Sequence, residues 1–437
     1  MTNSTLPFSN DLIREALEQT GVSAMSTASI REVVAVIKYL ENKTGEIFLR
    51  MDMGVPGLPT PAIGIESEIE ALKNGKSAVY GQIDGIPELK REVSRFVKNF
   101  LDIEVAEKSC IITAGSMMAS MITFMVAAKR EQSRQGVLFI DPGFPVQKKQ
   151  AHVMNLPIFS FDIYNYRGEK LYSKLEEICA KNGISVIVYS NPNNPTWICL
   201  SDEELKTIAD IANLHDIIIA EDLAYFGMDF RCDYGKPGQP PYQPTIAKHT
   251  DNYILLVSSS KILSFAGQRV GMLVVSDKLY HREFQNLLTI GDNLKLGPSL
   301  VMDGVYVISA GTGHSAQHGL TGMLAAINDG KYDFLEPLKE YALRASEMKN
   351  CFLQNGFQIL YNKDGEEELA DGFYFTVTYP GIEDEELSLG LIKCGLGTVS
   401  LKIMGSKGKA GVRISVSMVD IKHFTILNER LAMFDTL

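Results

Sequence analysis

The chain has 437 residues, of which 45% are hydrophobic and 22% are charged, a composition that fits a globular protein large enough for two domains. Its formal net charge is −11 and no long basic cluster occurs, which argues against a nucleic-acid or anionic-membrane surface. There is no run of eighteen apolar residues, and the first residues lack the basic and apolar segments of a signal peptide. We therefore expect no transmembrane helix and no secretory leader.

The cysteines are widely spaced and include no C-x-x-C pair. They are Cys110, Cys179, Cys199, Cys232, Cys351 and Cys394. This spacing favours neither a structural zinc site nor a disulfide framework. Scattered thiols are typical of a reducing compartment, so we expect a cytoplasmic protein that binds no metal.

The first part of the chain is expected to be helical, with one strand. An arm carrying a short helix is predicted at residues 1–25, and an amphipathic helix follows at Ser29–Leu40. A strand at Glu46–Asp52 leads into a rigid turn region rich in proline and glycine at Gly54–Pro61. A further helix is expected over Ile65–Asn74.

The central part of the chain alternates between strand and helix patterns. A strand, a turn of small residues and a helix start are predicted at Ile111–Ser120, where free N–H groups favour an anion. Further strands are expected at Val137–Ile140, Pro157–Phe161, Ser185–Ser190, Ile217–Glu221, Tyr253–Val257 and Met272–Val275. The alternation predicts a largely parallel sheet with helices on both faces, and the unbroken apolar runs agree with this.

The last part of the chain reads as a second, smaller α+β domain. A long helix is predicted at Asp333–Gln354. The strands predicted after it are Phe357–Leu360, Gly372–Thr378, Thr398–Lys402 and Val412–Val416. A loop rich in proline and glycine at 231–252 interrupts the large domain, and long loops of this kind are often functional.

One polar segment between two buried strands indicates chemistry. The segment Ser258–Gly271 contains serines at 258–260, then Lys261 and Arg269. A lysine at the end of a buried strand is costly unless it has a partner or a role, and forming a Schiff base is such a role. Nearby hydroxyls and Arg269 could hold a phosphate, so the segment suggests pyridoxal 5'-phosphate (PLP). Taken alone, it equally fits a surface lysine.

Three more motifs follow predicted strands, where open α/β sheets place ligands. They are Asp141-Pro-Gly-Phe-Pro-Val146, Ser190-Asn-Pro-Asn-Asn-Pro-Thr-Trp197 and Ala220-Glu-Asp-Leu-Ala-Tyr225. In this order, followed by the lysine segment, they resemble the class I/II aminotransferases of PLP fold type I. The resemblance runs over nearly the whole chain, from Ser29 to Arg413.

The resemblance implies a fold and a domain organisation. The fold class is α/β, with a large domain built on a mostly parallel, seven-stranded sheet covered by helices. A smaller α+β domain is formed from both ends of the chain. The implied bounds are an N-terminal arm at 1–25, a small domain at 26–55 and 311–437, and a large PLP-binding domain at 56–310.

The resemblance also implies roles around the cofactor ring. Lys261 would bind PLP covalently and later move a proton between the substrate Cα and the cofactor. Asp222 would pair with the pyridine nitrogen and keep it protonated, which strengthens the ring as an electron sink. Asn194 and Tyr225 would bind the phenolic oxygen, and Phe144 would stack on the ring.

Phosphate and substrate groups follow in the same way. Tyr80 would reach the phosphate of the partner subunit, so the site would be shared within a homodimer. Arg413 would bind the substrate α-carboxylate with a bidentate fork, next to Gly54 and Asn194. The residues that would hold the phosphate within the chain are Gly115, Ser116, Met117, Ser258, Ser260 and Arg269.

Departures from the family pattern leave the substrate open. Trp197, the only tryptophan, stands where the family usually has glycine, and either shapes the pocket or simply packs. Met117 and Met118 replace commoner polar residues, and the 231–252 loop is unusually long. Arg231 in that loop is a candidate for binding a substrate side-chain carboxylate.

The function implied is transfer of an amino group between an α-amino acid and a 2-oxo acid by a ping-pong mechanism, in amino-acid metabolism. A PLP-dependent lyase on the same scaffold, either a carbon–sulfur β-lyase or a cyclopropane-forming synthase, would keep the same residues and stays an alternative. A PLP-binding regulatory module is a remote alternative, because only about fifty residues precede Gly54, they read as an arm and a helix and not as a DNA-binding domain, and the net charge is acidic.

Overall fold

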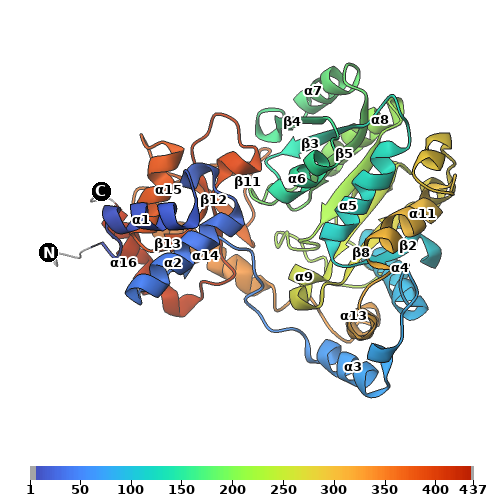
Figure 1. Cartoon of the computed structure of the whole chain (residues 1–437), viewed down its shortest axis with the longest axis horizontal. Helices are drawn as coiled ribbons and strands as arrows, with labels where there is room; N and C mark the ends of the chain where they lie inside the picture. The colour runs from blue at the N-terminus through green and yellow to red at the C-terminus, as the bar shows by residue number, and fades with distance from the viewer. Residues whose placement is uncertain (1–5, 435–437) are drawn as a thin grey trace.

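The computed structural model describes residues 6–434, which form a large and a small domain side by side (Figure 1). The large domain holds a seven-stranded sheet in the order β2-β8-β7-β6-β5-β3-β4. Only β8 runs antiparallel to its neighbours within this sheet. The strands are β2 (Cys110–Thr113), β3 (Gly136–Asp141), β4 (Ile158–Asp162), β5 (Ile184–Ser190), β6 (Ile218–Leu223), β7 (Tyr253–Ser258) and β8 (Gly271–Val275). The predicted fold class is confirmed.

The sheet is buried on both faces, as its apolar runs require. Adjacent residues of one strand, such as Ile218 and Ile219, belong to different hydrophobic clusters on opposite faces. One face is covered by α5 (Ser116–Val126) and α6 (Pro145–Val153). The other face is covered by α4 (Pro87–Leu101), α7 (Lys170–Cys179), α8 (Asp202–Leu214) and α13 (His314–Asn328).

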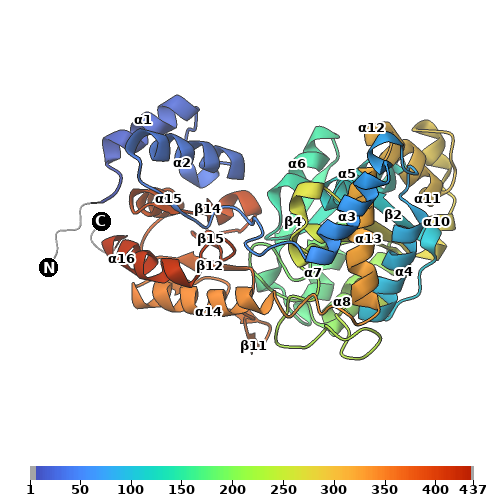
Figure 2. The ribbon, with the colours of Figure 1, turned by 90° about the horizontal axis from the view of Figure 1, so that it is seen from below.

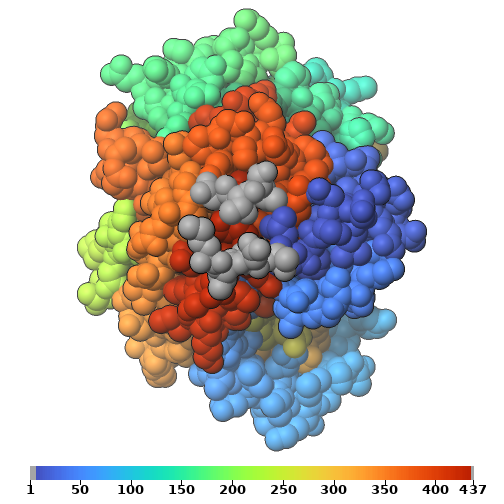
Figure 3. Space-filling view, turned by 90° about the vertical axis from the view of Figure 1, so that its left-hand side faces the viewer, coloured from blue at the N-terminus to red at the C-terminus, as the bar shows by residue number. Residues whose placement is uncertain are grey.

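The small domain combines an early and a late part of the chain, whose blue and red segments lie side by side on one face (Figure 3). Its main sheet has the order β14-β15-β12-β9 and is antiparallel, and a separate parallel pair joins β1 to β13. The strands are β1 (Leu49–Arg50), β9 (Gln358–Ile359), β12 (Tyr374–Thr378), β13 (Leu396–Gly397), β14 (Val399–Ser400) and β15 (Val412–Ser415). A hairpin of β10 (Lys363–Asp364) and β11 (Glu367–Glu368) extends from it.

The helices around this sheet come from both termini (Figure 2). They are α1 (Asn10–Thr20), α2 (Ile30–Thr44), α14 (Lys339–Gln354), α15 (Asp384–Lys393) and α16 (Phe424–Phe434). The remaining helices belong to the large domain: α3 (Ala62–Lys73), α9 (Ser259–Ile262), α10 (Asp277–His281), α11 (Leu296–Ser299) and α12 (Val307–Ser309). Within residues 6–434, no helix is long and apolar enough to cross a bilayer.

The structure differs from the predicted organisation at several boundaries. The segment predicted as an arm packs through Phe8 and Ile13 onto α2 and α15 of its own chain. α13, which lies within the range 311–437 predicted for the small domain, packs on α3 and α4. The strand predicted at Glu46–Asp52 shrinks to β1, and α14 starts at Lys339, after Pro337.

Candidate active site

The motif residues meet at one edge of the large sheet. β5, β6 and β7 are parallel neighbours, with Ser190 opposite Asp222 and Leu223 opposite Val257. Asn194 follows β5, Asp222 lies at the end of β6, and Lys261 lies in α9 directly after β7. Because parallel strands end at the same edge, these side chains gather there.

Among residues 6–434, the amine of Lys261 has no carboxylate partner. Its Nζ donates a hydrogen bond to the backbone oxygen of Gly54 and lies 5.7 Å from the ring centre of Phe373. Burial, reinforced by the positive charges of Arg413 and Arg269, lowers the pKa of Lys261 to about 8. The neutral amine that a carbonyl-attacking lysine needs is therefore accessible near neutral pH.

Asp222 is a buried carboxyl, and no cation lies beside it in the part of the chain that the structure describes. Its Oδ2 accepts a hydrogen bond from Gln147 Nε2 at 2.8 Å, and its Oδ1 accepts one from the Ala224 N–H at 3.1 Å. Burial raises the pKa of Asp222 to about 6, and these two hydrogen bonds offset part of that rise. Within residues 6–434 no salt bridge reaches this carboxyl, so a cationic ring nitrogen would suit it.

Arg413, Asn194 and Tyr225 form a chain of polar contacts across the two domains. Arg413 comes from β15 of the small domain and donates to Asn194 Oδ1 at 3.1 Å and to the backbone oxygen of Asp52 at 2.5 Å. Asn194 Nδ2 in turn lies 3.4 Å from the hydroxyl of Tyr225. Arg413 is 1% exposed, yet its Nε has no hydrogen-bond partner among the described residues. A buried, unpartnered guanidinium N–H fits a missing anionic ligand.

The predicted phosphate residues form a cradle with free donors. Gly115 precedes α5 with φ 77°, a left-handed conformation that favours glycine, and it lies close to the guanidinium of Arg269. Ser116 and Met117 are the first residues of α5, whose N–H groups have no partner within the helix. Ser258 is buried and caps α9 by accepting from the N–H of Ser260, while Arg269 is exposed.

Phe144 and Tyr80 lie outside this hydrogen-bonded network. Phe144 is the residue before α6 and is half-buried, which leaves part of its ring open to a ligand. Tyr80 is 96% exposed in a single chain. An aromatic side chain this exposed accords with the expectation that it serves a second chain.

The sequence does not predict two residues near the site, Gln147 and Tyr374, and it leaves open whether Trp197 shapes the pocket or simply packs. Gln147, which binds Asp222, lies one turn after Phe144, and this i, i+3 spacing on α6 was an available signal. Tyr374 binds the Tyr225 hydroxyl from the small domain, and no local pattern indicates that contact. Trp197 packs edge-on against both tyrosines and is fully buried, so it supports the site from behind.

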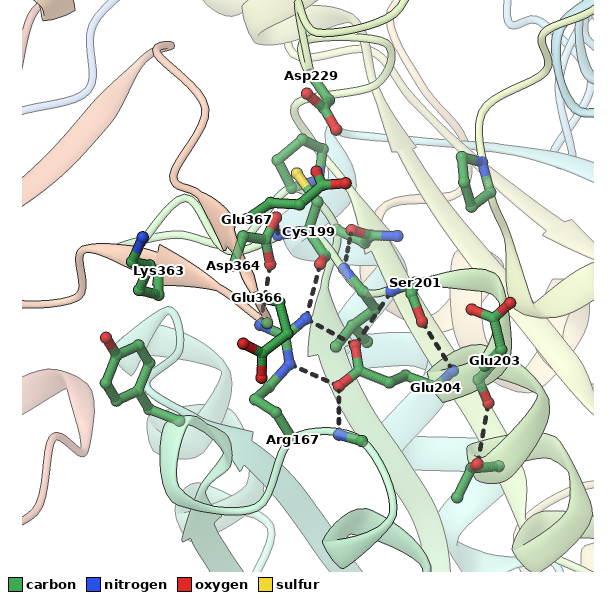
Figure 4. Close-up of a pocket in the computed structure, with 18 of the residues that line it drawn as sticks. Arg167, Cys199, Ser201, Glu203, Glu204, Asp229, Lys363, Asp364, Glu366 and Glu367 are labelled. Carbon is green, nitrogen blue, oxygen red and sulfur yellow. Dashed lines mark hydrogen bonds and ion pairs between the residues drawn. The ribbon is translucent and has the colours of Figure 1, made fainter.

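A separate cavity of about 990 Å³ lies between α7, α8 and the β10–β11 hairpin (Figure 4). None of the cofactor residues described above lines it, and several of its lining residues form ion pairs. Asp364 binds Arg167 at 2.9 Å and Arg231 at 2.8 Å, and Arg231 also pairs with Asp229 and Glu367. Arg231 is thus occupied by carboxylates of its own chain, and we no longer assign it to a substrate carboxylate.

The fold as a whole is that of known aminotransferases. The aspartate aminotransferase of Thermus thermophilus superposes with a TM-score of 0.75 over 94% of this chain and 98% of its own, at 17% identity. The alanine aminotransferase of Pyrococcus furiosus gives 0.75 over 96% and 99%, at 19% identity. At this level of identity the likeness defines the class of fold.

The sequence comparisons then give the family. Residues 47–332 match the family model described as aminotransferase class I and II, and the chain belongs to that family. A probable aspartate aminotransferase of Methanocaldococcus jannaschii is 29% identical over 245 residues, which are 56% of this chain and 61% of that protein. An asparagine–oxo-acid transaminase of Streptococcus mutans is 28% identical over 232 residues, 53% of this chain and 57% of its own. The matches span about three-fifths of these relatives.

Proposed function

We propose that the protein is a PLP-dependent aminotransferase that moves an amino group between an α-amino acid and a 2-oxo acid. The observation that carries the proposal is that three side chains meet at one site. The first is a lysine with a lowered pKa, and the second is a buried carboxyl that no cation contacts among the described residues. The third is a buried arginine with one N–H that has no hydrogen-bond partner there. These are Lys261, Asp222 and Arg413. Family membership supports the same conclusion.

The residues divide the work between binding and proton transfer. Bound PLP supplies the electron sink that stabilises negative charge at the substrate Cα. Lys261 would hold the cofactor through Nζ, and the same amine would move a proton between the substrate Cα and the cofactor. Asp222 keeps a proton on the ring nitrogen, and Tyr225 and Asn194 hold the phenolic oxygen.

The remaining residues position the phosphate and the substrate. The α5 N-terminus, Ser258, Ser260 and Arg269 hold the phosphate. Arg413 holds the α-carboxylate, with Gly54 and Asn194 beside it, and Phe144 covers the ring.

The working unit in this proposal is a homodimer that shares Tyr80 between subunits. Apolar side chains with helical spacing, Ile65, Ile69 and Leu72, are 44–47% exposed along α3, and Val79 next to Tyr80 is 59% exposed. A second copy would cover this stripe and accept Tyr80. We place the protein in the cytoplasm, since the cysteines of the described chain are all free.

The test is a pair of half-reactions. The PLP-loaded protein is mixed with single amino acids and no acceptor, starting with aspartate, asparagine and alanine, for which relatives are named. We expect a lasting change in the visible spectrum, one equivalent of 2-oxo acid, and return of the spectrum on adding a different 2-oxo acid. Steady-state rates should be ping-pong.

One outcome would redirect the proposal. Catalytic release of ammonia without an acceptor would indicate a lyase. The Lys261→Ala protein is the matched control and should carry out neither half-reaction at a measurable rate.

A further inference from the structure

Tyr374 brings a hydroxyl of the small domain into the active site of the large domain. It is the first residue of β12 and is 2% exposed. The hydroxyl of Tyr225 donates to the hydroxyl of Tyr374 across 2.9 Å. Neither the family resemblance nor any motif in the sequence assigns a role to Tyr374.

The Tyr374 hydroxyl lies against the backbone of Gly54, at a position where a side chain would clash with it. A Cβ on Gly54 would lie 1.8 Å from the Tyr374 oxygen, so the hydroxyl occupies space that only a glycine provides. The backbone oxygen of Gly54 is also the acceptor for Lys261 Nζ. The Tyr374 hydroxyl therefore touches the same peptide that positions the lysine.

The ring of Tyr374 supports the arginine. The guanidinium carbon of Arg413 lies 4.5 Å from the ring centre, which is a cation–π contact. Arg413 has no carboxylate partner among the described residues. A guanidinium held by an aromatic face and neutral oxygens keeps its charge available for an incoming anion, whereas a carboxylate partner would compete with that anion.

A hydrogen-bond count shows what the Tyr374 hydroxyl adds. Tyr225 has a single phenolic proton, and either hydroxyl can donate across its 2.9 Å contact with Tyr374. Asn194 Nδ2 already donates to the Tyr225 oxygen at 3.4 Å. Rotation of the two O–H bonds reverses the Tyr225–Tyr374 hydrogen bond without moving a heavy atom. Tyr374 then donates to Tyr225, and the Tyr225 proton is free for another acceptor.

We propose that Tyr374 is a positioning residue with two separable parts, a hydroxyl that redirects the Tyr225 proton to the phenolic oxygen of PLP and a ring that presents Arg413 to the substrate carboxylate. The inference rests on the function proposed above. It names a residue through which the small domain tunes the cofactor, in addition to binding the substrate.

Two substitutions separate the two parts. Tyr374→Phe keeps the ring and removes the hydroxyl. The Tyr225 oxygen then loses the hydrogen bond that Tyr374 donates, so Tyr225 is a weaker donor to the phenolic oxygen of PLP. Because the negative charge on that oxygen is less stabilised, the lysine–cofactor linkage keeps its proton to higher pH. We expect the pH midpoint of the visible absorption change to rise by about 0.5–1 unit. Affinity for propionate, a carboxylate without an amine, should stay within about twofold.

Tyr374→Leu removes both parts. The midpoint should rise as in Tyr374→Phe, and propionate affinity should also fall by about threefold, the loss expected from one cation–π contact. Thermal unfolding of the cofactor-free proteins checks that both variants fold. An unchanged propionate affinity in a folded Tyr374→Leu protein would overturn the role of the ring.

A double-mutant cycle with Tyr225→Phe decides the role of the hydroxyl. If Tyr374 acts through Tyr225, Tyr374→Phe adds no further shift in a Tyr225→Phe background. An additive shift, or no shift in Tyr374→Phe alone, would overturn the inference while leaving the proposed function intact. Failure of the proposed function would give a different result, because the wild-type protein would then bind no PLP and show no visible band.

Discussion

At the scale of single residues, the site depends on placing charges where burial disfavours them. Desolvation shifts both Lys261 and Asp222 toward their neutral forms, with pKa values of about 8 and about 6. A bound PLP would favour the charged form of Asp222, because its cationic ring nitrogen would pair with the carboxylate. Covalent attachment of PLP would instead require the neutral form of Lys261. The two shifts thus have opposite consequences once the cofactor is bound.

The lowered pKa of Lys261 predicts how cofactor capture depends on pH. The cofactor-free protein should bind PLP faster as pH rises, with a midpoint near 8, because only the neutral amine attacks the aldehyde. Stopped-flow absorbance between pH 6 and 10 measures this, and Lys261→Ala gives the background from other lysines. A midpoint near the ordinary value of about 10.4 would show that the amine is not desolvated.

Asp222 and its neighbour Glu221 make a matched pair of buried carboxyls. Asp222→Asn should still bind PLP but lose several orders of magnitude in turnover, since the ring nitrogen would lose its anionic partner. Glu221 instead accepts from Thr245 Oγ1 at 2.5 Å and from the Ile246 N–H at 3.2 Å. Glu221→Gln should therefore keep near-normal turnover. Equal losses in the two variants would mean that Asp222 has no special role.

Glu221 also gives the protein a pH-dependent stability. Burial raises the pKa of Glu221 to about 7 in the fold, above its ordinary value of 4.5. Its contribution to stability is thus fully present below about 4.5 and is lost as pH rises through 7. We expect wild type to lose stability relative to Glu221→Gln between pH 5 and 8 in thermal unfolding. A constant difference over that range would contradict the shifted pKa.

At the scale of elements, Asp364 is the buried carboxylate at the centre of the contact between the β10–β11 hairpin and the large domain. Asp364 binds Arg167 and Arg231 and also accepts from the N–H of Cys199, two residues after Trp197 (Figure 4). Arg167 in turn donates to the Cys199 oxygen at 3.1 Å. The ion-pair network thereby fixes the segment that places Trp197 behind Tyr225.

The Asp364 carboxylate has an exposed counterpart for comparison. Asp364→Asn should lower the free energy of unfolding by about 3 kcal/mol, because its side chain is 3% exposed and two arginines would lose a buried partner. Glu367→Gln should change stability little, since Glu367 is 77% exposed and lies 3.3 Å from Arg231. Urea unfolding of both variants measures the difference, and similar small effects would show that the hairpin is not held by this network.

The same scale shows what could be predicted from the sequence. Strand ends are readable because apolar runs stop at polar motifs, so the positions of Asn194, Asp222 and Lys261 followed from local pattern. Tyr374 and the position of α13 were not readable. The Tyr225–Tyr374 contact joins residues 149 positions apart and depends on how two domains pack. The apolar face of α13 fits a core in either domain, so its pattern does not say which.

At the scale of the whole molecule, the proposed dimer predicts complementation between two inactive chains. Tyr80→Ala chains lack the shared tyrosine and Lys261→Ala chains lack the amine, but a hybrid dimer has one site with both. Random mixing makes half of the dimers hybrid, so about a quarter of the wild-type activity should return. No recovery after proven subunit exchange, or a fully active monomer by light scattering, would contradict a shared site.

The central claim is that Lys261 is the residue that binds PLP covalently, and reductive trapping tests it most directly. The PLP-loaded protein is treated with borohydride, digested and mapped by mass spectrometry. We expect loss of the visible band and a single pyridoxyl-modified lysine at position 261, in the peptide that follows β7. A label on another lysine, or a protein that carries no trapped cofactor, would contradict the account.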